Sequence, residues 1–146
     1  MDISTKKFTE LSLQELYEML QLRSEVFVVE QNCVYQDIDG KDQKSLHVLG
    51  KVNNQIVAYC RIFKSGDYFK YASVGRVVVS PKMRGKNYGH IIFEASVKAI
   101  KSFYNEEKIK ISAQQYLTKF YNEHNFKQIG DFYLEDGIPH VAMVNF

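Results

Sequence analysis

Residues 77–90 read Val-Val-Val-Ser-Pro-Lys-Met-Arg-Gly-Lys-Asn-Tyr-Gly-His. The valines continue a nearly apolar run that starts at Val74, which is typical of a strand covered on both faces and central in its sheet. Pro81 ends this run because proline cannot donate to a strand ladder. A helix is indicated downstream by residues at helical spacing, Ile92, Ala95, Ala99 and Phe103. The stretch therefore predicts a buried strand, a basic loop and the start of a helix.

The loop between these two elements has the features of an anion site. At a helix N-terminus the first backbone N–H groups lack helical partners, and the helix dipole is positive there. Gly85 and Gly89 let the backbone approach a ligand closely, while Lys82, Arg84 and Lys86 add positive charge. The sequence therefore predicts a site for a pyrophosphate group.

The elements on either side of this unit alternate between strands and helices. On the N-terminal side, the capping box from Ser12 to Glu15 begins a helix near residue 13, with one apolar face formed by Leu13, Leu16, Leu20 and Phe27. Residues 46–49 and 56–62 predict a hairpin that turns at Asn53-Asn54. The first half of the chain thus predicts a helix followed by paired strands.

On the C-terminal side, residues 108–113 predict a strand that a right-handed crossover brings parallel to the valine strand. A short helix around Tyr121 follows, and the chain ends in a second hairpin that turns at residues 135–137. Together the elements predict a single α/β domain over residues 1–146.

Composition excludes several classes of protein. The 146 residues are 45% hydrophobic and 25% charged, with a net charge of only +2, so a general attraction to nucleic acid or to an anionic membrane is not expected. No apolar leader or spanning run is present, which predicts a cytoplasmic protein, and Cys33 and Cys60 are expected to be reduced structural thiols. No metal is expected, because a calcium loop starting at Asp37 would need a glutamate where Val48 stands.

Two motifs resemble those of a known family. Arg84 and Gly89 fit motif A of the GNAT acyltransferases, in which an arginine or glutamine is followed by two residues, a glycine, one residue and a glycine or alanine; Asn87 replaces the middle glycine. Residues 120–126 are similar to the family's Phe-Tyr-x-x-x-Gly-Phe, with Asn125 in place of glycine. Asparagine is the side chain that best tolerates the left-handed conformation that glycine adopts.

The likeness extends over nearly the whole chain. Residues 22–31, 35–40 and 135–140 resemble the ElaA-type branch of the superfamily, and Arg23 to Phe27 are also similar to an element of the acyl-homoserine-lactone synthases. The resemblance implies the acyl-CoA N-acyltransferase fold, a mixed central sheet with flanking helices and two parallel strands that splay apart. Acetyl-CoA would lie in the cleft between these strands, bound by Val77, Val78, Val79, Arg84, Gly85, Lys86, Asn87, Tyr88, Gly89 and Gln114.

The resemblance also implies a reaction, the direct transfer of the acetyl group to an amine of a small molecule or peptide. Tyr121 is the expected general acid toward the CoA thiolate. The candidates for the general base are Glu30, His47 and His140, in that order, and an amine that is already neutral would need none. A non-catalytic acyl-CoA-binding module is the alternative, and it would not need Tyr121.

Several expectations concern side chains outside the motifs. An acidic acceptor mouth for a cationic amine is predicted from five carboxylates, Glu30, Asp37, Asp39, Glu135 and Asp136. Arg61 and Arg76 are expected to pair with buried carboxylates, and His90 and His124 to lie on the surface without partners. The oligomeric state stays open, although an exposed C-terminal strand would permit a homodimer.

Overall fold

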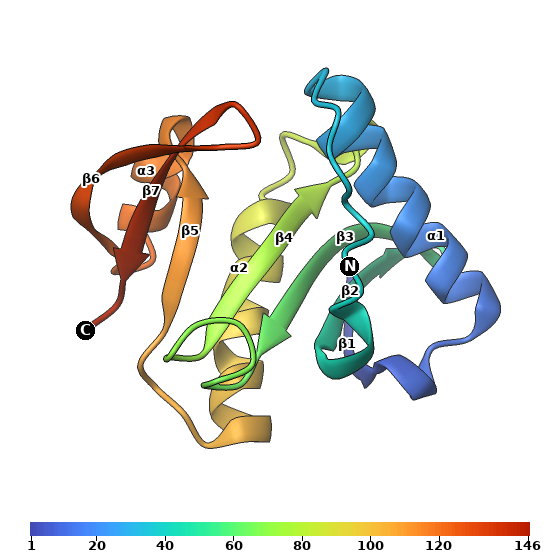
Figure 1. Ribbon diagram of the computed structural model, residues 1–146. Coiled ribbons are helices and arrows are strands. Elements are labelled where there is room, and N and C mark those ends of the chain that lie inside the picture. The colour runs from blue at the N-terminus through green and yellow to red at the C-terminus, as the bar shows by residue number, and fades with distance from the viewer.

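The strands of the computed structural model, which describes residues 1–146, form two antiparallel sheets that part from one another (Figure 1). The first sheet has the order β1-β2-β3-β4, with bounds β1 Asp2–Lys7, β2 Leu46–Val52, β3 Gln55–Phe63 and β4 Ser73–Val79. The second has the order β5-β7-β6, with bounds β5 Lys110–Gln114, β6 Lys127–Glu135 and β7 Ile138–Val144. The parallel contact between β4 and β5 is a single bridge, Ala72 to Ile109.

Three α-helices flank the sheets, and two of them widen into π-helical turns at their C-terminal ends. Their bounds are α1 Leu13–Arg23, continued by η2 Ser24–Glu30, α2 Tyr88–Ala99, continued by η5 Ile100–Tyr104, and α3 Thr118–Asn122. Short 3-10 turns occupy η1 Phe8–Glu10, η3 Asp42–Lys44, η4 Pro81–Met83 and η6 Gln115–Leu117. No helix is both long and apolar enough to cross a bilayer.

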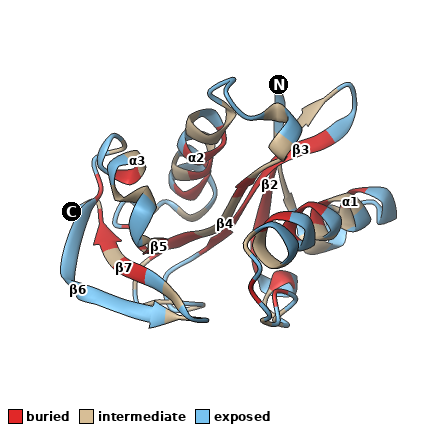
Figure 2. Ribbon diagram, turned by 90° about the horizontal axis from the view of Figure 1, so that it is seen from above, coloured by how far each residue is buried: buried red, intermediate tan, exposed pale blue.

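The first sheet is covered on both faces, as Figure 2 shows with α2 on one side and α1 on the other. Adjacent strand residues point to opposite faces, so Val48 packs into the cluster around α2 and Leu49 into the cluster that contains Met19 and Leu22 of α1. Both β2 residues are completely buried. β2, β3 and the hairpin turn at Asn53-Asn54 are as predicted, whereas the edge strand β1 was not expected from the sequence.

Three sequence expectations need correction. Leu13 is 87% exposed, and the buried stripe of the first helix runs instead through Met19, Leu22 and Val26. Phe103 is also exposed, because the helix has changed to π-helical geometry before this residue and its register is shifted. The C-terminal strand β7 lies in the middle of its sheet, so the exposed edge belongs to β6.

Glu15 holds the first helix against β1 and β2. Its carboxylate caps Ser12 and accepts hydrogen bonds from the Nζ atoms of Lys6, at 2.9 Å, and Lys51, at 2.8 Å. Burial alone would raise the pKa of this carboxyl, but the two lysines and the cap outweigh it and lower the pKa from 4.5 to about 2. The interaction therefore stabilises the fold at neutral pH.

We expect the free energy of unfolding to fall as the pH drops from about 4.5 to about 2 through protonation of Glu15. A carboxyl whose pKa is lower in the folded state contributes stability above its unfolded pKa and loses it as the pH falls through the folded one. Urea unfolding at pH 7 and at pH 3 measures this loss. Glu15→Gln should lose less stability between the two pH values than the unsubstituted protein; an equal loss would contradict the assignment.

Candidate active site

A pocket of about 710 Å³ opens where β4 and β5 diverge. Its walls come from both sheets, from η2, from the loop before α2 and from α3, and half of its lining residues are apolar. Twelve of the fourteen residues that the sequence predicts for the catalytic and cofactor sites line it; the exceptions are His47 and Lys86, which is exposed on the loop outside the pocket. The volume is within the range typical of small-molecule and cofactor sites.

The edge of β4 that faces the pocket carries main-chain groups without a strand partner. β4 pairs with β3 on its other side, and only Ala72, just before β4, meets β5. The β3–β4 register shifts beside Arg76, which has a left-handed φ of 53° within the strand. Such a bulge re-aims peptide groups, and a positive φ at a non-glycine residue is strain that its surroundings must hold. Val77, Val78 and Val79 follow the bulge and line the pocket.

The loop after β4 has the backbone that an anion site requires. Gly85 has a φ of 80° and Asn87 a φ of 66°, so this asparagine adopts the left-handed conformation expected for the glycine it replaces. The Asn87 side chain does not cap α2, which leaves the N–H groups of the first turn open toward the pocket. At the second motif Asn125 likewise has a φ of 67°. Both replacements therefore preserve the backbone of the motif.

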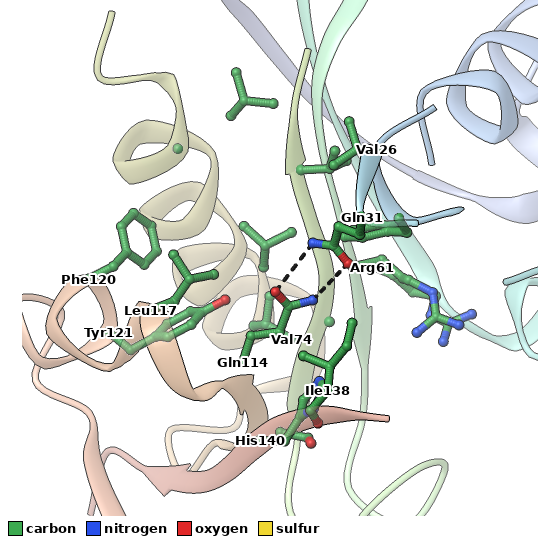
Figure 3. A pocket seen from close by; sticks show the side chains of 18 of the residues that line it. Val26, Gln31, Arg61, Val74, Gln114, Leu117, Phe120, Tyr121, Ile138 and His140 are labelled. Carbon is green, nitrogen blue, oxygen red and sulfur yellow. Dashed lines mark hydrogen bonds between the residues drawn. The ribbon is translucent and has the colours of Figure 1, made fainter. Parts of the chain in front are cut away.

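Tyr121 points from α3 into the same pocket (Figure 3). Its ring packs edge-on against Phe93 and Phe120, with centroid separations of 5.1 and 5.0 Å. Its hydroxyl makes no hydrogen bond with another residue of the chain. Burial raises the pKa of this hydroxyl, so it stays protonated at neutral pH and remains a potential proton donor.

Two side-chain pairs cross the pocket from the end of η2. Glu30 accepts hydrogen bonds from both Nη atoms of Arg84, at 2.8 and 3.1 Å. Gln31 and Gln114 exchange two amide hydrogen bonds of 3.1 and 3.3 Å, and Figure 3 shows the two amides facing one another between Tyr121 and Arg61. In each pair the partner of the η2 side chain, Arg84 or Gln114, is a residue that the sequence assigns to the cofactor.

His140 lies at the β7 side of the pocket. Its Nδ1 is 2.7 Å from the carbonyl oxygen of Ile138, to which it donates, and its Nε2 is 3.3 Å from a carboxylate oxygen of Glu135. The other oxygen of Glu135 accepts a hydrogen bond of 3.1 Å from Ser112. His47, in contrast, does not line the pocket, since it is fully buried in β2 and bonded to Tyr59 of β3.

The predicted acidic mouth is only partly present. Asp37 and Asp39 are bound by arginines, with Arg23 and Arg76 on Asp37 and Arg61 on Asp39, all at 2.7 to 2.9 Å. Arg61 and Arg76 therefore pair with carboxylates as expected, and these carboxylates are neutralised. The acidic groups that remain at the pocket without an arginine partner are Glu135 and Asp136.

A second correction concerns the histidines. His90 in the first turn of α2 and His124 after α3 are not solitary, because the Nδ1 of His90 lies 2.9 Å from the Nε2 of His124. The ring of His90 also packs on Phe120 at 4.5 Å. Their separation of 34 residues gave no local spacing that would have revealed the pair.

The family model of the Acetyltransferase (GNAT) domain matches residues 7–145. The chain belongs to the GNAT family. Protein ElaA of Escherichia coli K12 is 42% identical to it over 137 residues, which are 92% of this chain and 90% of ElaA. This GNAT protein is therefore an acetyltransferase by family, and its resemblance to the ElaA-type branch is confirmed.

Solved structures agree with this assignment. An acyl-CoA N-acyltransferase from Pseudomonas aeruginosa superposes with a TM-score of 0.92 at 36% identity, with all of both chains covered. The crystal structure of Escherichia coli ElaA gives a TM-score of 0.91 at 39% identity over 99% of both chains. An aminoglycoside 6'-N-acetyltransferase complexed with coenzyme A shares the fold, with a TM-score of 0.73 at 14% identity over 99% of this chain and 96% of that one.

Sequence reasoning missed two features of this GNAT pocket. Gln31 was not predicted as a site residue. Its pairing with Gln114 spans 83 residues of sequence, so no local pattern indicates the pair. The bulge at Arg76 gave no signal either, because arginine is not a residue that favours a left-handed φ. In the folded protein its Nε lies 2.7 Å from a carboxylate oxygen of Asp37.

Proposed function

We propose that this GNAT protein transfers the acetyl group of acetyl-CoA directly to a primary amine of a small molecule or peptide. One observation carries the proposal: the unpaired edge of β4 leads straight into the open N-terminus of α2. The first offers main-chain groups to the amides of a pantetheine arm, and the second offers N–H groups to a pyrophosphate. The aminoglycoside acetyltransferase of the same fold is complexed with coenzyme A.

The residues of the pocket suit the chemistry of such a donor. Acetyl-CoA supplies a thioester whose carbonyl carbon accepts an amine nitrogen. A β4 N–H from Val78 or Val79 would polarise the carbonyl, as in an oxyanion site. When the new C–N bond forms and the C–S bond breaks, the Tyr121 hydroxyl would give its proton to the leaving thiolate. No covalent intermediate on the protein is needed.

The incoming amine must lose a proton, and we assign this step to His140. The hydrogen bond from its Nδ1 to Ile138 leaves Nε2 as the basic nitrogen, and Glu135 lies 3.3 Å from it. The carboxylate would stabilise the imidazolium that forms. Glu30, the first candidate from the sequence, binds Arg84 through both of its oxygens in the free protein, so it could act as the base only where that pair has opened.

Calorimetric titration with acetyl-CoA tests the donor assignment. We expect micromolar binding, with an affinity about 10- to 100-fold weaker in Arg84→Ala, because the substitution removes a charge-assisted hydrogen bond to phosphate. Lys98→Ala is the matched control, since Lys98 is an exposed basic residue of α2 whose partner is Glu94. Release of CoA in a panel of primary amines then identifies acceptors. An unsubstituted protein that does not bind acetyl-CoA would overturn the proposal.

A further inference from the structure

Two residues at the end of η2 bind side chains that the proposed function assigns to the cofactor, Arg84 and Gln114. Glu30 binds the guanidinium of Arg84 through both carboxylate oxygens, and the next residue, Gln31, binds the amide of Gln114 through both its donor and its acceptor. The two pairs come from adjacent positions and reach opposite walls of one pocket, the loop before α2 and the end of β5.

The chemistry of each η2 side chain matches one part of acetyl-CoA. A carboxylate and a phosphate present the same pair of anionic oxygens to the guanidinium fork of an arginine. A glutamine side chain and a secondary amide both offer an N–H donor and a carbonyl acceptor. Glu30 thus satisfies Arg84 as a pyrophosphate would, and Gln31 satisfies Gln114 as the pantetheine arm would.

We infer that Glu30 and Gln31 are placeholders, which hold the polar partners of the cofactor in the free protein and release them when it binds. This inference rests on the proposed function. Exchange of both pairs frees the Glu30 carboxylate and the Gln31 amide at the same edge of the pocket. The acceptor amine then meets a carboxylate and an amide that were occupied before.

The pairs are suited to exchange rather than to permanent locking. The side chains of Arg84 and Glu30 are 45% and 40% exposed, and ion pairs at such positions are weak. Glu30 is the last residue of the π-helical segment Ser24–Glu30 and Gln31 is its C-cap, and π-helical geometry is frequent at functional sites. The cofactor binds only those molecules in which the pair is open. Its apparent affinity is therefore the intrinsic affinity multiplied by the fraction of open molecules.

A double-mutant cycle tests the ion pair, with CoA as the probe in calorimetry. Glu30→Gln should bind CoA about two- to five-fold more tightly than the unsubstituted protein, because Arg84 is already free. In an Arg84→Ala background the same substitution should change the affinity little. Equal tightening in both backgrounds would mean that removal of a negative charge near the phosphates is the whole effect, and would overturn the inference. Glu25→Gln, an exposed residue of η2 outside the pocket, controls for distant charge.

Gln31→Ala tests the second pair without any change of charge. It frees Gln114, so it should also tighten CoA binding by about two- to five-fold, and unchanged or weaker binding would contradict the placeholder role. Both placeholders are at least partly exposed, so neither substitution threatens the fold. Absence of CoA binding to the unsubstituted protein would overturn the proposed function itself, and the inference with it; normal binding without tightening in the variants overturns the inference alone.

Discussion

Replacement of Tyr121 by phenylalanine should lower the rate of CoA release with the best acceptor amine by about 100-fold or more, the usual contribution of a general acid. The expected loss is confined to kcat. The Tyr121 hydroxyl makes no hydrogen bond within the chain, and the ring keeps its packing on Phe93 and Phe120, so stability should be unchanged. Steady-state kinetics and calorimetry with CoA separate the effects on turnover and on binding.

Tyr17→Phe is the matched control for this experiment, because Tyr17 is 69% exposed on α1 and lies outside the pocket. A Tyr121→Phe protein with undiminished turnover of every accepted amine would show that another group protonates the thiolate. A chain that binds CoA but releases none from acetyl-CoA with any amine would instead be the non-catalytic acyl-CoA-binding module.

The largest effect on stability is expected at Arg23. This arginine is completely buried, and its guanidinium donates to Asp37 at 2.9 Å and to Asp42 at 2.8 Å. Arg23→Met removes the cation and leaves two buried carboxylates without it, which should cost about 3–5 kcal/mol of unfolding free energy. Denaturant unfolding measures the loss as a lower midpoint with an unchanged slope.

Lys98→Met gives the comparison for an exposed pair, since Lys98 and Glu94 are separated by 3.0 Å but are 74% and 59% exposed. Its expected cost is below about 1 kcal/mol. An Arg23→Met protein that is destabilised no more than Lys98→Met would contradict the role given to the buried cluster. The cluster also holds Arg76, so its disruption is expected to reach the bulge of β4.

The parts of the fold that could be predicted from the sequence are those encoded locally. The valine strand, the loop and α2 occupy consecutive residues, and the left-handed φ of Asn87 follows from the chemistry of asparagine. The hairpin at Asn53-Asn54 is equally local. Family resemblance then brought Gln114 and Tyr121 to the same cleft, and both line the pocket.

The parts that could not be predicted depend on contacts between distant segments. The carboxylates of Asp37 and Asp39 were expected to face an acceptor, but strand geometry places Arg61 and Arg76 against them. Glu30 was expected to be a free base, and its bond to Arg84 spans 54 residues. No spacing rule links such pairs, because their distance in space is set by the sheet and not by the chain.

The single β-bridge between the two sheets links ligand binding to the stability of the domain. Apart from the bridge of Ala72 with Ile109, no strand ladder ties β4 to β5, so the two halves of the domain are joined along this seam by side-chain packing rather than by main-chain hydrogen bonds. A ligand that bonds to both walls acts as an additional strand shared by the two halves. Part of its binding free energy is then free energy of folding, and the cohesion of the domain rises with the concentration of its cofactor.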